Sequence, residues 1–69
     1  MELGIAKAVR LAGSQTALGK LVRVSPQAVQ KWVEKGLVPP RRCRAIEKAL
    51  SGAVTRYELN EEAFGPADN

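Results

Sequence analysis

Three polar side chains, Gln27, Gln30 and Lys31, have the chemistry needed to read the edges of DNA bases. They fall on one side of a short predicted helix, and the apolar residues Val29 and Trp32 fall on the other side. A glutamine amide can pair with N6 and N7 of adenine, and a lysine can donate to O6 or N7 of guanine or to a phosphate. The spacing therefore predicts base contacts by this trio in a DNA major groove, with a solvated polar face as the alternative.

Two predicted helices joined by a two-residue turn would position these side chains. Ser25 and Pro26 predict the start of a helix over residues 26–35, because the serine hydroxyl can accept from a free backbone N–H and proline fits the first helical position. A preceding helix is expected over residues 14–22, with Ser14 as its cap. A helix pair of this kind is typical of helix-turn-helix proteins.

Apolar spacing predicts two further helices, over residues 2–12 and about 40–50. Thr55 and Glu58 have the spacing of a capping box, which predicts a short fifth helix. The β-branched and aromatic side chains of residues 54–59 favour a strand instead, so both structures remain open for this segment.

The expected fold class is all-α, a small domain of four or five helices with a central helix-turn-helix. Residues 1–64 are expected to form this single domain, and residues 65–69 to form a frayed acidic tail. Leu21 and Cys43 are expected to face inward, and Tyr57 is expected to pack or to form part of a dimer surface rather than to stack on a base. Helical spacing assigns four further side chains to the core of the helix pair: Leu18, Val22, Val29 and Trp32.

The chain is basic, and its charge is unevenly distributed. It has 69 residues and a formal net charge of +4. Residues 1–56 contain all eleven Lys and Arg residues and three acidic residues, whereas residues 57–69 contain four acidic residues and no basic one. A basic body favours a polyanionic partner such as double-stranded DNA. A chain of this size buries a small core, so we expect association into a homodimer that is weak or induced by DNA.

Several classes of protein are not expected from this composition. The chain has no histidine and one cysteine, which argues against a multi-ligand metal site and against a disulfide within the chain. It has no paired carboxylates suited to acid–base chemistry and no glycine-rich phosphate loop, so we expect neither an enzyme nor a cofactor. No apolar run is as long as a membrane span, so we expect a cytoplasmic protein.

Residues 15–33, QTALGKLVRVSPQAVQKWV, resemble the helix-turn-helix of the phage Cro repressors and of the related YdaS-type antitoxin or regulator family. The similarity continues through SPQAVQKWVEKGLVPPRRCRAIEKA and GAVTRYEL, and so covers residues 15–64. The resemblance implies a lambda-repressor-like, Cro-like fold. It also implies that Gln15 contacts a backbone phosphate, that Gly19 is the small residue of the first motif helix, that Val24 faces the core of the helix pair, and that Ser25 faces the groove with the polar trio. It further implies that the cell is bacterial or phage-infected.

The chain departs from the family pattern at two positions. Arg23 stands where the turn usually has glycine, so it is expected to adopt left-handed backbone angles at a steric cost. Pro26 replaces a residue that reaches DNA in some members, which removes one contact. Neither departure disturbs the predicted helix pair.

Contacts with the DNA backbone are expected from residues at helix starts and from cations near the helix pair. Free N–H groups and side chains at a helix start can bind a phosphate, and arginine and lysine add positive charge. Solvent exposure without a contact is the alternative for each cation. The candidate phosphate-contacting residues are Ser14, Gln15, Lys20, Arg23, Ser25, Lys35, Arg41 and Arg42.

Together these features predict a sequence-specific DNA-binding transcriptional regulator, a Cro-type repressor that binds a short palindromic operator as a dimer. The helix over residues 26–35 would enter the major groove. The alternative is a YdaS-type antitoxin or protein-interaction module that neutralises a toxin partner, with the acidic C-terminal segment as a contact surface. The two functions can coexist in one chain.

Overall fold

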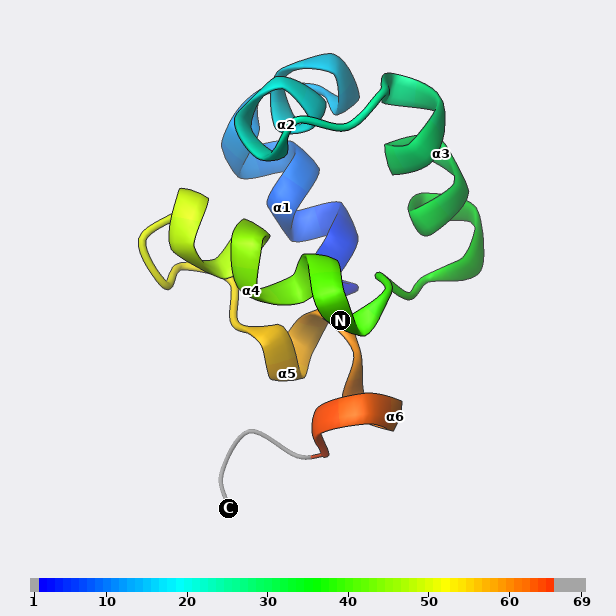
Figure 1. Ribbon diagram of the computed structural model, residues 1–69, viewed down its shortest axis with the longest axis vertical. Helices are drawn as coiled ribbons and strands as arrows, with labels where there is room; N and C mark the ends of the chain where they lie inside the picture. The colour runs from blue at the N-terminus through cyan, green and yellow to red at the C-terminus, as the bar shows by residue number, and fades with distance from the viewer. Residues whose placement is uncertain (1, 66–69) are drawn as a thin grey trace.

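Six helices follow one another along the part of the chain that the computed structural model describes, residues 2–65. They are α1 (Gly4–Ala12), α2 (Gln15–Val22), α3 (Pro26–Lys35), α4 (Pro40–Ala49), α5 (Arg56–Leu59) and α6 (Glu61–Phe64). In Figure 1, α2 and α3 lie at the upper end of the molecule, α5 and α6 lie at the lower end, and α1 and α4 lie between them. Residues 2–65 contain no strand, so the all-α prediction is confirmed and the strand alternative for residues 54–59 is wrong. The predicted tail falls outside the described residues except for Gly65.

The two helices of the central pair begin as predicted from their caps. The Ser14 hydroxyl oxygen accepts from the backbone N–H of Ala17 at 3.0 Å, and the Ser25 hydroxyl oxygen accepts from that of Ala28 at 3.2 Å. Each hydrogen bond satisfies one N–H group that has no partner within its helix. The helix α3 spans the predicted residues, whereas α1 begins two residues later than predicted.

The helix α5 forms because side chains from two places satisfy its first N–H groups. The Thr55 hydroxyl oxygen accepts from the N–H of Glu58 at 3.3 Å, as in the first half of a capping box. In addition, Oε1 of Glu47, on α4, accepts from the N–H of Arg56 at 3.2 Å. This second contact comes from a residue nine positions earlier, and it fixes the start of α5 on α4.

Asn60 and the helix α6 that it caps were not predicted. Oδ1 of Asn60 accepts from the N–H of Ala63 at 3.0 Å, and Nδ2 of this buried side chain donates to the carbonyl oxygen of Val38 at 2.8 Å. The N–H of Val38 in turn donates to the carbonyl oxygen of Leu59 at 3.2 Å. The connector between α3 and α4 is therefore held by Leu59, the last residue of α5, and by Asn60, which precedes α6.

The core confirms most of the predicted inward residues. Of the five predicted for the helix pair, Leu18, Val22, Val29 and Trp32 are buried, and Val24 packs against them half-buried. The other buried apolar residues are Ile5, Ala8, Val38, Cys43, Ile46, Val54 and Leu59.

The prediction that Leu21 faces inward is wrong, because 51% of its surface is exposed. Gly19 is buried beside Leu18 and Val22, so the buried side of α2 is rotated toward Gly19. This rotation leaves Leu21 at the edge of the helix.

Two glycines allow backbone segments to pack closely. Gly19 lies under the turn between α2 and α3, and Gly4 lies where α1 meets α5. A Cβ at Gly19 would lie 2.7 Å from the carbonyl oxygen of Val24. The turn between α2 and α3 can therefore pack this closely against α2 only because residue 19 is a glycine. A Cβ at Gly4 would overlap the carbonyl oxygen of Glu58, so α1 could not approach α5 as closely. The family resemblance implied the first requirement, and nothing in the sequence analysis implied the second.

Arg23 adopts the left-handed conformation that the comparison with the family pattern predicted. Its backbone angles are φ 61° and ψ 44°, and its side chain is exposed. A residue with a Cβ pays a steric cost in this conformation, which the packing of α2 against α3 has to offset.

Candidate nucleic-acid interface

The exposed side of α3 carries the three side chains that were predicted to contact bases. Gln27, Gln30 and Lys31 are all exposed, whereas Val29 and Trp32 on the opposite side are buried in the core. The burial of these two residues fixes how α3 is rotated about its axis. The amides and the ammonium group therefore point away from the protein, where a duplex could approach.

Glu34 belongs to the same exposed side, and the sequence analysis gave it no role. Nε2 of Gln30 donates to Oε2 of Glu34 at 3.2 Å, across one turn of α3. The spacing of four residues was a visible indication of this contact, since such residues are neighbours on a helix surface.

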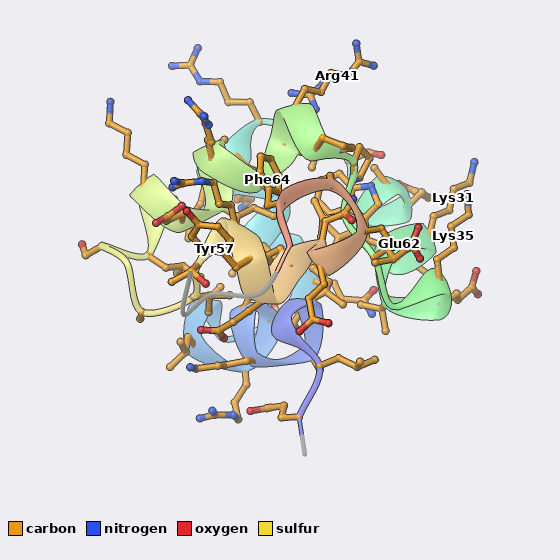
Figure 2. All side chains as sticks on the ribbon, turned by 90° about the horizontal axis from the view of Figure 1, so that it is seen from below. Lys31, Lys35, Arg41, Tyr57, Glu62 and Phe64 are labelled. Carbon is orange, nitrogen blue, oxygen red and sulfur yellow. The ribbon has the colours of Figure 1, made fainter. Side chains whose placement is uncertain are left out.

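Lys31 and Lys35 project side by side from α3, and Arg41 projects from the start of α4 (Figure 2). The two lysines lie at the rim of a cavity of about 290 Å³, which Trp32 and the connector after α3 also line. Tyr57 and Phe64 lie nearer the middle of the view in Figure 2. Their rings meet edge to face at a centroid distance of 6.4 Å, so Tyr57 packs against Phe64, in agreement with its predicted role.

The predicted phosphate contacts at the helix starts are located on two separate turns. Ser14 and Ser25 are exposed, and each hydroxyl oxygen already accepts a capping hydrogen bond, so the hydroxyl hydrogen is the group left to donate to a phosphate. Gln15 is half-buried at the first position of α2. The first N–H groups of a helix also attract anions, and these two helix starts supply them next to exposed polar side chains.

The predicted cations share one property, which is that no ion pair in residues 2–65 involves them. The ion pairs of this region are Lys7–Glu58 at 3.5 Å, Arg10–Glu2 at 3.0 Å and Arg56–Glu47 at 3.1 Å. Arg42 is half-buried, and the other predicted cations are exposed: Lys20, Arg23, Lys35 and Arg41. Arg44 and Lys48, on α4, are exposed and outside these pairs as well, and the sequence analysis did not select them.

The side chains with a shifted pKa lie outside this surface. The hydrogen bond and charge of Arg10 lower the pKa of the Glu2 carboxyl. Burial raises the pKa of the Cys43 thiol, which donates to the carbonyl oxygens of Val38 at 3.5 Å and Pro39 at 3.4 Å. Cys43 is thus a buried, protonated core residue, as predicted from its position on α4.

Residues 2–65 lack both a metal-binding cluster and a membrane-spanning helix. This part of the chain holds no cluster of three or more His, Cys, Asp or Glu side chains placed to bind a metal ion. Among the same residues, no helix is both long enough and apolar enough to cross a membrane.

Comparison with known proteins gives a consistent result. The family described as "Bacterial toxin YdaS" matches residues 5–67. The chain belongs to the YdaS family. Over 58 residues it is 40% identical to the "putative transcriptional regulator YdaS" of Escherichia coli strain K12, an alignment that covers 81% of this chain and 58% of that protein. The chain thus spans less than two thirds of the length of this relative.

A solved structure shows that this YdaS-family fold is Cro-like. The Cro protein from the "putative prophage element Xfaso 1" of Xylella fastidiosa strain Ann-1 superposes with a TM-score of 0.80 and is 36% identical. The match covers 84% of this chain and 89% of the Cro protein. The predicted resemblance to Cro and YdaS proteins and the predicted helix-turn-helix fold are therefore confirmed.

Proposed function

We propose that this YdaS-family protein is a sequence-specific DNA-binding transcriptional regulator whose helix α3 enters the major groove. The observation that carries the proposal is the exposure of Gln27, Gln30 and Lys31 opposite the buried Val29 and Trp32. Amides and a cation on an exposed helix match the donors and acceptors that base pairs present in the major groove. The names of the two relatives, a transcriptional regulator and a Cro protein, support the same function.

The remaining predicted contacts would fix the protein on the DNA backbone. The starts of α2 and α3 supply Ser14, Gln15 and Ser25, and cations without ion pairs flank them: Lys20, Arg23, Lys35, Arg41 and Arg42. Backbone contacts position a protein on DNA, and base contacts select the sequence. Such a protein needs no catalytic group, because it acts by occupying DNA that other proteins use.

The proposed active form is a weak or DNA-induced dimer on a short palindromic operator. A two-fold symmetric dimer presents two copies of α3 to two half-sites one helical turn apart. We assume that each protomer neutralises about three to five phosphates. A plot of the logarithm of the dimer's binding constant against the logarithm of the salt concentration should then have a slope of roughly −5 to −9. A slope near zero would contradict DNA binding by this surface.

The decisive variant is Gln27→Ala, because Gln27 lies on the first turn of α3, where side chains reach deepest into the groove. The probe is a duplex of about 30 base pairs, selected by the protein from a random pool and long enough for two half-sites. We expect Gln27→Ala to weaken binding to this duplex by roughly tenfold or more. Binding to a shuffled duplex should stay within about twofold, since a lost base contact does not affect backbone contacts. Equal losses on both duplexes would instead place Gln27 on the DNA backbone.

A second function, as a protein-interaction module of the antitoxin type, is favoured by one hollow on the side of α5 and α6. Glu2, Glu58, Glu61 and Glu62 surround this cavity of about 350 Å³, and Leu3, which is 56% exposed, contributes an apolar wall. A toxin with a basic, partly apolar surface would fit it. The test compares the chain with its Glu61→Gln/Glu62→Gln variant in co-purification with the products of the adjacent genes. We expect the variant to keep DNA binding and to lose the partner, whereas an unchanged partner would reject this surface.

A further inference from the structure

Glu34 is a carboxylate on the exposed side of α3, at the site proposed to face DNA. It follows Gln27 by seven residues and Lys31 by three, so the three side chains share one side of the helix. Glu34 is exposed, and it accepts a hydrogen bond of 3.2 Å from Nε2 of Gln30. It is also the one acidic residue between residues 14 and 35, which form the helix pair and its turn.

The stability of the helix does not explain this carboxylate. Glu34 lies in the last turn of α3, where the helix dipole is negative and an acidic side chain is unfavourable. Within residues 2–65, none of the ion pairs involves Glu34, although Lys31 and Lys35 belong to the same helix. A negative charge also repels the phosphates of any duplex that approaches α3. Because Glu34 is unfavourable both for the helix dipole and for the approach of DNA, a role in recognition is the explanation that remains.

We propose that Glu34 is a positioning residue that orients the amide of Gln30 and thereby raises the specificity of α3 for its operator; the inference rests on the proposed DNA-binding function. A glutamine side-chain amide has two N–H groups and one carbonyl oxygen. Glu34 holds one N–H of Gln30, which leaves the other N–H and the carbonyl oxygen free. These are the donor and the acceptor that N7 and N6 of adenine require.

The charge of Glu34 acts in the same direction as its hydrogen bond. Repulsion between the carboxylate and phosphates weakens binding to every duplex, whatever its sequence. The fixed amide of Gln30 strengthens binding only where the matching base pair is present. The two effects together increase the ratio between specific and non-specific affinity.

The experiment measures this ratio for the full chain with two probes, the duplex selected from a random pool and a shuffled duplex of the same composition. Glu34→Ala is expected to bind the shuffled duplex about fivefold more tightly at low salt, because a repulsive unit charge is removed. The ratio of its affinities for the selected and the shuffled duplex is expected to fall by about tenfold, because the side-chain amide of Gln30 is then free to rotate. Glu34→Gln should also bind the shuffled duplex more tightly but keep most of the preference, since its carbonyl oxygen can still accept from Gln30.

Two controls separate this role from general effects of charge and of helix stability. Glu61→Gln, on exposed α6, makes the same change in net charge away from α3, and both affinities should stay within about twofold. In a Gln30→Ala background, Glu34→Ala should no longer reduce the preference, because the amide that it orients is absent.

An unchanged preference in Glu34→Ala would overturn the inference, as would an equal reduction with and without Gln30. A shift in melting temperature with no change in preference would assign the Gln30–Glu34 contact to helix stability alone. These outcomes leave the proposed function intact. Salt-independent or absent binding of the unsubstituted chain to both duplexes would overturn the proposed function, and this inference with it.

Discussion

Two regions of the molecule differ in whether their cations form ion pairs. One is the contact between α1 and α5, and the other is the helix pair α2–α3. Lys7 of α1 pairs with Glu58 of α5, and Arg10 pairs with Glu2, so the cations of α1 are neutralised within the protein. Among the described residues, no cation of α2, of α3 or of the turn between them has an acidic partner within ion-pair distance. One region uses its charges in its own packing, and the other leaves them free for a partner.

This difference shows what net charge alone cannot show. A formal charge of +4 is compatible with a basic face anywhere on the molecule. The positions of the acidic residues decide where the free charge lies, because exposed ion pairs add little stability but do cancel charge. The cations of the helix pair therefore form no ion pair among the described residues, and their charge is available to a partner such as a phosphate.

The largest effect is expected from removing free cations at the start of α4. Arg41→Gln/Arg42→Gln should lower the affinity for any duplex by roughly a hundredfold at about 0.1 M salt, because each lost phosphate contact removes one released counterion. Selected and shuffled duplexes should be affected alike, since backbone contacts carry no sequence information. A titration of binding against salt measures this, and its slope should become less steep.

The matched control for this comparison is Lys7→Gln/Arg10→Gln, which removes two cations from the neutralised region. We expect its affinity to change far less, because Glu58 and Glu2 already cancel these charges. If both double variants lost affinity equally, net charge would be sufficient to explain binding, and the difference between paired and unpaired cations would have no functional meaning.

A smaller effect is expected at Asn60, which links the C-terminal segment to the connector after α3. Asn60→Ala removes the hydrogen bond to the Val38 carbonyl oxygen and the cap of α6, so the free energy of unfolding should fall by about 2 kcal/mol. Denaturant unfolding measures this, with Glu61→Ala as an exposed control that should stay within about 0.5 kcal/mol. Equal stability of the two variants would mean that the connector is held by other contacts.

Local sequence patterns were sufficient to predict the helix pair and its exposed residues. Ser25 and Pro26 act on the backbone next to them, so the start of α3 followed from short-range chemistry. The outward direction of Gln27 and Gln30 followed from the apolar side chains of Val29 and Trp32 on the opposite side of the helix. The left-handed backbone of Arg23 was also predictable, since the family pattern has glycine at that position.

The features that were missed depend on residues far apart in the sequence. No role was predicted for Gly4, whose missing Cβ makes room for the carbonyl oxygen of Glu58. Leu21 was assigned to the core because a periodic pattern does not show which way a helix is rotated when a glycine is buried. Asn60 is a polar residue whose burial depends on Val38, 22 residues earlier, and no local pattern indicates such a partner.

The hydrogen bonds between Val38 and the pair Leu59 and Asn60 have a consequence for synthesis of the protein. The ribosome adds residues 59 and 60, which hold the connector that follows α3, only after it has made all of α3. Domains fold as units once their parts are present. The hydrogen bonds that fix the connector after α3 can therefore form only after translation has passed Asn60.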